Sequence, residues 1–273
     1  MTDPALPKYD HPPVVETILG VQFEPIAGLH SAHLGAFWAT LGADWPSTDE
    51  AAPLEPQFER FDDGARWAEL GLRLRLSALP QPRIRIRNAA NNRMIQLQNG
   101  RFIVNWLGVA GEPYPNYETI RDDFAANLRR FCDFLANVAN LPLPTANQWE
   151  VTYLNHIPKG TVWNTPAEWD FFLPLQTRAG LKSAQLESYS GEWQYVVPPQ
   201  RGRLHVHWQH GKSDDQRELI VLNLTGRGPC NAPKLDADPI LEGLNLGRET
   251  IVRSFRDLMS DAANHYWGLQ YVT

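Results

Sequence analysis

The hydrophobic and polar positions of this chain follow strand and helix periods, and the predicted elements come in the same order twice. In the first half, an apolar, β-branched run at 12–23 predicts a strand, and 31–41 predicts a short helix. A proline-rich stretch at 46–56 is expected to form a loop. Apolar positions three and four residues apart predict a long amphipathic helix over 117–140. The extended runs of this half lie at 57–62, 67–76, 83–88, 93–98 and 101–107.

The second half repeats this order. A strand is predicted at 147–158, a short helix at 165–175 and a long helical region at 236–268. The extended runs of this half lie at 186–189, 192–198, 203–209 and 217–225. Each half is therefore predicted to be β-α-β4-α, with helices on one face of an antiparallel sheet.

Residue identities support an internal duplication. The long helix of the first half begins with ETIRDDF, and ETIVRSF lies in the matching helix of the second half. We therefore predict an α+β fold of two tandem halves, 12–140 and 147–268, forming one compact pseudo-two-fold unit. Phe124 and Phe255, the last residues of the two motifs, are expected to be buried. The continuous antiparallel sheet resembles the topology of the TATA-box-binding protein fold, and that likeness carries no function.

Arginine occupies every second position of the run 83–88. Because side chains alternate between the two faces of a strand, Arg83, Arg85 and Arg87 are expected on the face opposite the intervening isoleucines. One interpretation pairs them with carboxylates on neighbouring strands. The other is an anion site, because the guanidinium group matches carboxylate and phosphate geometry. The same alternation places further residues on this open polar face: Gln96, Gln98, Arg101, Asn105, Arg203, His205 and His207.

Motifs for catalysis and metal binding are few. His205 and His207 could ligate a metal, but the sequence has no Cys-x-x-Cys, His-Glu-x-x-His or Asp-rich loop near them, so no metal and no cofactor is predicted. Gly-x-Ser-x-Gly, a Walker loop and Gly-x-Gly-x-x-Gly are also missing, and TGRGPC at 225–230 is expected to be a turn. Glu16 and Glu150 begin corresponding strands. They could form an acid–base pair or be structural partners of arginine.

Composition restricts the partner and the compartment. The chain has 273 residues and a net charge of −6, which disfavours a protein that coats nucleic acid through Lys and Arg. No apolar run is long enough for a membrane span, and the first residues lack the features of a signal peptide. Cys132 and Cys230 suggest no disulfide framework, so a reducing, cytoplasmic location is expected.

Several motifs together resemble a sporadically distributed bacterial family of uncharacterised proteins. They are PPVVETILGVQFEP, MIQLQNGRFIVNW, YPNYE, QWEVTYLNHI and the terminal HYWG. The resemblance covers about 10–270 and implies kinship without an activity. Its patchy distribution is typical of accessory genes, including defence genes. One departure is Trp149, where the family pattern implies a small residue or cysteine.

These observations favour a non-enzymatic binding or adaptor protein. Its polar, arginine-bearing sheet face, or the groove between its halves, would hold a small anionic ligand or a protein partner. A nucleic-acid-binding saddle is the first alternative, since Arg, Gln and Asn on an open sheet suit that ligand. An enzyme with a small-molecule cleft between the halves is the second.

Overall fold

Nine strands form one antiparallel sheet in the computed structural model of this protein, which describes residues 5–61, 81–109, 112–171, 187–188, 190–235 and 237–271. In spatial order the strands are β3 (Ser47–Ala51), β4 (Arg83–Arg87), β5 (Arg93–Gln98), β6 (Arg101–Leu107), β2 (Val14–Phe23), β7 (Ala146–Pro158), β10 (Glu218–Ala232), β9 (Gly202–Lys212) and β8 (Gly191–Val197). A second sheet pairs β1 (Pro7–Tyr9) with β11 (Leu269–Tyr271).

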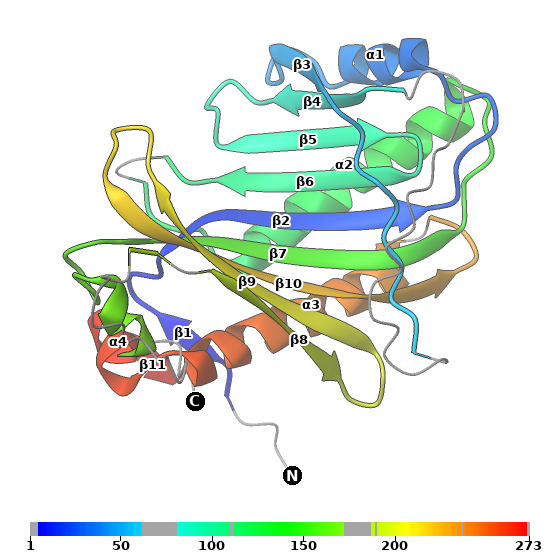
Figure 1. The fold of residues 1–273 in the computed structure, drawn as a ribbon. Coiled ribbons are helices and arrows are strands. Elements are labelled where there is room, and N and C mark those ends of the chain that lie inside the picture. Colours follow the sequence, from blue (N-terminus) through cyan, green and yellow to red (C-terminus); the bar gives the residue numbers. More distant parts are fainter. Residues whose placement is uncertain are drawn as a thin grey trace.

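Two long helices, α2 (Tyr117–Asn137) and α3 (Ala237–Leu258), cover one face of the large sheet (Figure 1). The shorter elements are α1 (Ser31–Thr40), the 3-10 helix η1 (Pro166–Phe171) and α4 (Asp261–Tyr266). In the part of the chain that the structure describes, no helix is long and apolar enough to cross a membrane. The structure is thus a mixed α+β fold, and α2 and α3 do not cover the opposite face of the sheet.

The core lies between the sheet and the helices. Phe124 is fully buried and Phe255 is 6% exposed, so the predicted burial of both residues is confirmed. Phe131 of α2 stacks on Phe102 of β6 with ring centroids 5.6 Å apart, and Phe37 of α1 meets Phe131 edge-on at 5.4 Å. The i, i+3, i+4 spacing of α2 therefore aligns its apolar residues over the first half of the sheet.

Trp149 of β7 lies in a slot made by glycines. A Cβ atom on Gly243 or Gly247 of α3 would overlap its indole ring, at 2.7 Å in the case of Gly247, and one on Gly228 of β10 would come within 2.5 Å. The indole is 3% exposed. A large ring thus fits at this position because its neighbours lack side chains.

Most predicted elements are present, with four corrections. The extended run predicted at 57–62 forms no strand over its described residues, 57–61, which belong to neither sheet. The loop expected over 46–56 is wrong at its start, because residues 47–51 pair with β4 as the edge strand β3. The turn expected at 225–230 is also wrong, since these residues continue β10. The helical region 236–268 is interrupted at Ser260, which caps α4. The run 67–76 and most of 172–189 lie outside the described residues.

Candidate binding site on the sheet face opposite the helices

Residues 52–61, here called the crossing segment, run over the sheet face opposite α2 and α3 (Figure 1). The segment lies across the strands and joins no ladder. Its contacts follow the spatial order of the strands, from Gln98 of β5 through Gln22 of β2 to Arg203 of β9. The sheet residues that contact it are called the polar platform. They are Gln22, Gln98, Arg101, Gln148, Arg203, His205 and Arg227.

Two glutamine side chains of the platform bind the backbone of the crossing segment. Gln98 accepts from the Leu54 N–H at 2.8 Å and donates to the Leu54 carbonyl at 2.9 Å. Gln22 accepts from the Gln57 N–H at 2.9 Å and donates to the Gln57 carbonyl at 3.1 Å. A primary amide offers one acceptor and two donors, so it can pair with a peptide unit as a strand edge does. These contacts hold the backbone whatever side chains the segment carries.

The Glu59 carboxylate is held by three basic side chains. Arg203 Nη1 donates to Oε2 at 2.6 Å, His205 Nε2 lies 2.8 Å from Oε1, and Arg227 Nη1 lies 3.4 Å from Oε1. Only 5% of the Glu59 side chain is exposed. Burial alone would raise the pKa of Glu59, but the hydrogen bonds from His205 and Arg203, with the charges of His205 and Arg227, outweigh it and lower that pKa.

Strand register explains why these cations gather. Arg203 of β9 and Arg227 of β10 are direct cross-strand partners, so two guanidinium groups lie side by side on one face. Like charges in such a pair repel unless an anion lies between them. Arg227 also donates to Glu150 of β7 at 2.6 Å, which neutralises one of the two charges. Glu59 neutralises the other, and the Arg203 guanidinium stacks 4.6 Å from the Phe61 ring centroid.

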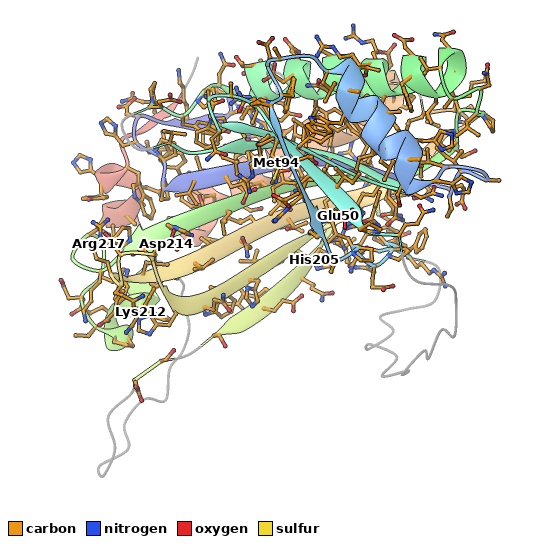
Figure 2. The ribbon with its side chains drawn as sticks, turned by 90° about the horizontal axis from the view of Figure 1, so that it is seen from above. Glu50, Met94, His205, Lys212, Asp214 and Arg217 are labelled. Carbon is orange, nitrogen blue, oxygen red and sulfur yellow. The ribbon has the colours of Figure 1, made fainter. Side chains whose placement is uncertain are left out.

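The view in Figure 2 places His205 on the sheet side away from α2. The hairpin between β9 and β10, which carries Lys212, Asp214 and Arg217, projects at the opposite end of these strands. The platform therefore meets β9 and β10 at the ends of these strands away from this hairpin. Beneath the crossing segment lies a cavity of about 10 Å³. Its lining comprises four platform residues, Gln57 of the segment, Glu150 and the residues Gly20, Val21 and Ile103. That volume is close to the space needed for one water molecule.

The prediction that the open face is exposed to solvent is wrong for four residues of the first half. Gln96, Gln98, Arg101 and Asn105 are all less than 10% exposed. Gln98 and Arg101 are covered because the crossing segment lies on them, and burial lowers the pKa of Arg101. Gln96 donates to Asn105 at 2.8 Å, within a buried polar network.

That network continues to Glu16 of β2. Asn105 donates to the Glu16 carboxylate at 2.6 Å, and burial raises the pKa of Glu16. Glu150 instead has an arginine partner, Arg227. The Glu16 and Glu150 carboxylates thus have different hydrogen-bond partners. The expected role as a structural partner of arginine agrees with the contacts of Glu150, whereas the hydrogen-bond partner of Glu16 is Asn105.

The arginines of β4 lie apart from the Glu59 cluster. Arg85 pairs with Asp49 of the edge strand β3 at 2.5 Å, which is the cross-strand pairing that the sequence left open. Arg87 donates to Asn91 at 3.3 Å, and Arg83 precedes them on the same face. Of the residues predicted in the second half, Arg203 and His205 join the platform. His207, two residues further along β9, is not part of these contacts.

Sequence reasoning missed the covering role of the crossing segment and three of its partners. Gln22, Gln148 and Arg227 lie near strand ends and share the outward alternation, which was the available signal. Glu59 lies in the run 57–62 that was predicted to be extended, but nothing in that run indicates that it crosses the sheet face and places the carboxylate beside Arg203. Among the described residues, no group of three or more His, Cys, Asp or Glu side chains could hold a metal ion.

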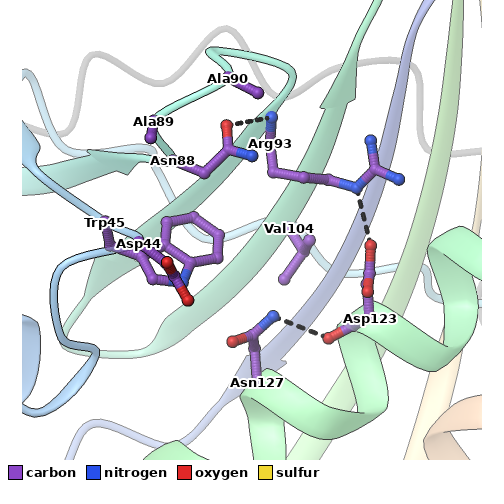
Figure 3. Close-up of a pocket in the computed structure, with 9 residues that line it drawn as sticks. All are labelled: Asp44, Trp45, Asn88, Ala89, Ala90, Arg93, Val104, Asp123 and Asn127. Atoms are coloured by element: carbon purple, nitrogen blue, oxygen red, sulfur yellow. Dashed lines mark hydrogen bonds and ion pairs between the residues drawn. The ribbon is translucent and has the colours of Figure 1, made fainter.

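A separate pocket of about 360 Å³ lies on the α2 side of the sheet (Figure 3). Arg93 of β5 forms an ion pair with Asp123 of α2 at 2.7 Å, and Asn127 donates to the Asp123 carbonyl. The Trp45 ring and the Asp44 carboxylate line the other side. This pocket belongs to the first half alone and shares no residue with the platform.

Comparison of the chain with family models, with curated proteins and with solved structures gives no match.

Proposed function

We propose that this protein is a non-enzymatic binding or adaptor protein whose polar platform holds an anionic ligand or an anionic segment of a protein partner. The observation that carries the proposal is the Glu59 site. Arg203 and Arg227 are opposed in register, and their charges meet on a carboxylate that comes from a non-adjacent segment. The sheet therefore provides a preformed carboxylate site, and Glu59 shows which chemistry fits it.

The charge balance supports this proposal. Without Glu59, Arg227 keeps its ion pair with Glu150, and the half-exposed Glu192 carboxylate lies 3.8 Å from His205 Nδ1. Arg203 then loses its carboxylate partner. An uncompensated, partly buried cation is unfavourable, so the site favours an anion. The Arg203 and Arg227 side chains are 20% and 14% exposed, which keeps solvent screening low.

The same contacts weigh against the first alternative, a nucleic-acid saddle. Arg85 is paired with Asp49, and Arg227 with Glu150, so few guanidinium groups are left for phosphates. The crossing segment also covers the part of the face that a duplex would contact (Figure 1). The net charge of −6 adds a general repulsion.

The position of the platform agrees with a site between two related halves. We propose that 12–140 and 147–268 are tandem copies, because β2 and β7 are neighbours at the middle of the strand order and α2 and α3 lie on one face. The crossing segment comes from the first copy and ends on β9 of the second. Kinship with the sporadic bacterial family and a cytoplasmic location belong to the same proposal, and the low cysteine content of the sequence supports that location.

The test replaces Glu59 and returns its carboxylate as a free ion. Glu59→Ala removes a CH2–COO⁻ group, which is the size of acetate. We expect sodium acetate to raise the melting temperature of Glu59→Ala saturably at constant ionic strength, while sodium chloride does not. The control is Glu55→Ala, since the Glu55 side chain is exposed and only its carbonyl contacts the platform. Equal melting temperatures in acetate and chloride would overturn the proposal.

A further inference from the structure

We infer that the polar platform binds an extended, proline-spaced acidic peptide of a protein partner, and that the crossing segment occupies the site as an internal copy of that peptide. This inference rests on the proposed function, because it concerns the same site and adds the class of ligand.

The geometry of the backbone contacts supports a peptide ligand. Gln98 lies on β5 and Gln22 on β2, with β6 between them, so the two amides are two strand spacings apart, about 9.6 Å. Their partners Leu54 and Gln57 are three residues apart, and three residues of polyproline II span about 9.3 Å. A peptide crossing the strands in that conformation thus meets an amide once per turn.

The sequence of the crossing segment has the same period. Pro53, Pro56 and Glu59 form a Pro-x-x-Pro-x-x-Glu pattern. Each proline directly precedes a residue whose backbone is paired with a platform glutamine. Proline has no N–H and favours the polyproline conformation, so it extends the chain without leaving a donor unpaired. The third repeat delivers a carboxylate to the Arg203 site.

Side-chain exposure shows which peptide positions the platform leaves free. Glu55 and Phe58 are exposed, Phe58 by 50%, so side chains there are not selected. The Glu59 side chain is the buried one, so the carboxylate determines specificity. A ligand would therefore need two backbone pairs three residues apart and an acidic residue two positions after the second pair.

The place of the segment in the chain fits an internal copy. β3 and β4 are antiparallel neighbours, and such strands can be joined by two to five residues, by common hairpin geometry. Here residues 52–82 connect them. The chain is therefore longer at this point than the pairing of β3 with β4 requires. Covalent attachment gives the internal copy an effective concentration in the millimolar range, so a partner peptide must displace it.

The test supplies the segment as a free peptide to a variant whose own copy is disabled. Gln57→Pro with Glu59→Ala removes the N–H that pairs with Gln22 and the carboxylate, and leaves every platform residue in place. The probe is a fluorescein-labelled, terminally blocked APLEPQFERF, the sequence of residues 52–61, and binding is read by fluorescence anisotropy. We expect saturable binding to this variant and at least tenfold weaker binding to the wild-type protein.

Peptide variants test the pattern. Glu59→Gln in the peptide should weaken binding about tenfold to a hundredfold, because a charge-assisted bond is lost, whereas Glu55→Gln in the peptide should not. One glycine inserted between the two prolines should weaken it similarly by breaking the period, and a scrambled peptide controls for composition. Arg203→Ala, added to the disabled variant, should abolish binding, whereas Arg130→Ala, at an exposed arginine of α2 on the other side of the sheet, should not. If the double variant does not fold, Glu59→Ala alone is used with the same peptides.

The outcomes separate this inference from the proposed function. Equal binding of the parent, inserted and scrambled peptides would overturn the inference. No peptide binding, together with acetate rescue of Glu59→Ala, would also overturn it and leave a small-anion site. Failure of acetate rescue would remove the proposed function as well.

Discussion

Adding one methyl group to a helix should have opposite effects at two glycines of this protein. Gly35 lies in α1 with no atom within 4 Å of a built Cβ, whereas a Cβ on Gly243 of α3 would overlap three indole atoms of Trp149. Ala is favoured over Gly by about 0.8–1.0 kcal/mol in a helix interior. Gly35→Ala should therefore stabilise the protein by about that amount.

At Gly243 the steric cost exceeds this gain. Trp149 is 3% exposed and is also enclosed by Gly228 and Gly247, so the ring cannot move aside. Overpacking of a core typically costs about 1–3 kcal/mol, and three overlapping atoms place this site near the upper end. After the helix-propensity gain, we expect Gly243→Ala to be destabilised by about 2 kcal/mol. That corresponds to a melting temperature about 4–8 °C lower, at about 2–4 °C per kcal/mol for a chain of this size class.

Urea denaturation and scanning calorimetry measure both variants against the wild-type protein. A double-mutant cycle with Trp149→Ala tests the cause, since the two changes should couple favourably by more than about 0.5 kcal/mol if the indole is what the new methyl group meets. A Gly243→Ala protein as stable as Gly35→Ala would refute this account of the packing between β7 and α3.

Three further expectations concern charge. Because the folded-state pKa of Glu59 is lowered, its stabilising contribution is present above the unfolded value of 4.5 and is lost as pH falls through the folded value; melting temperatures of wild type and Glu59→Ala should converge in acid. The raised pKa of Glu16 has the opposite sign, so Glu16→Gln, which keeps an acceptor for Asn105, should be neutral or stabilising at pH 7 and lose that advantage in acid by the same assay. Arg85→Glu should change the free energy of unfolding by no more than about 1 kcal/mol, because Arg85 and Asp49 are 34% and 45% exposed, and should leave peptide binding unchanged by anisotropy. Separate melting curves in acid, a clearly destabilised Glu16→Gln or a loss of binding in Arg85→Glu would contradict these expectations in turn.

The strands and helices of this fold could be predicted because their apolar residues repeat with the period of the element. Ile84 and Ile86 alternate with arginines and are buried, and Phe124 lies on the apolar stripe of α2. Periodicity depends only on residues that are close together in the sequence, so it can be read without knowledge of the tertiary structure. The edge strand β3 was missed because its sequence, STDEA, has no apolar alternation. It forms because β4 offers an unpaired edge, and polar residues there protect the sheet from further pairing.

The candidate site could be predicted only in part, for a physical reason. Strand alternation correctly placed Arg203 and His205 on one face. It could not predict that the crossing segment covers that face. The contacts of the crossing segment join residues far apart in sequence, such as Arg203 and Glu59, through polar groups that any loop contains. Arg227 was assigned to a turn because two glycines flank it. Those glycines instead allow close approach, Gly226 to Gly247 of α3 and Gly228 to Trp149.

The arginines of this sheet serve two purposes, and burial of the partner distinguishes them. Arg85 of β4 meets Asp49 on the adjacent edge strand, where both groups are solvated and the pair contributes little to stability. Arg203 and Arg227 face each other on β9 and β10, and no neighbouring strand supplies a carboxylate to Arg203. Its partner comes from the crossing segment and is nearly inaccessible to solvent. Solvated pairs such as Arg85–Asp49 would be enough to give the sheet a charged surface. The arrangement at Arg203 leaves a cation dependent on an anion from outside the sheet, and that dependence is what a binding site requires.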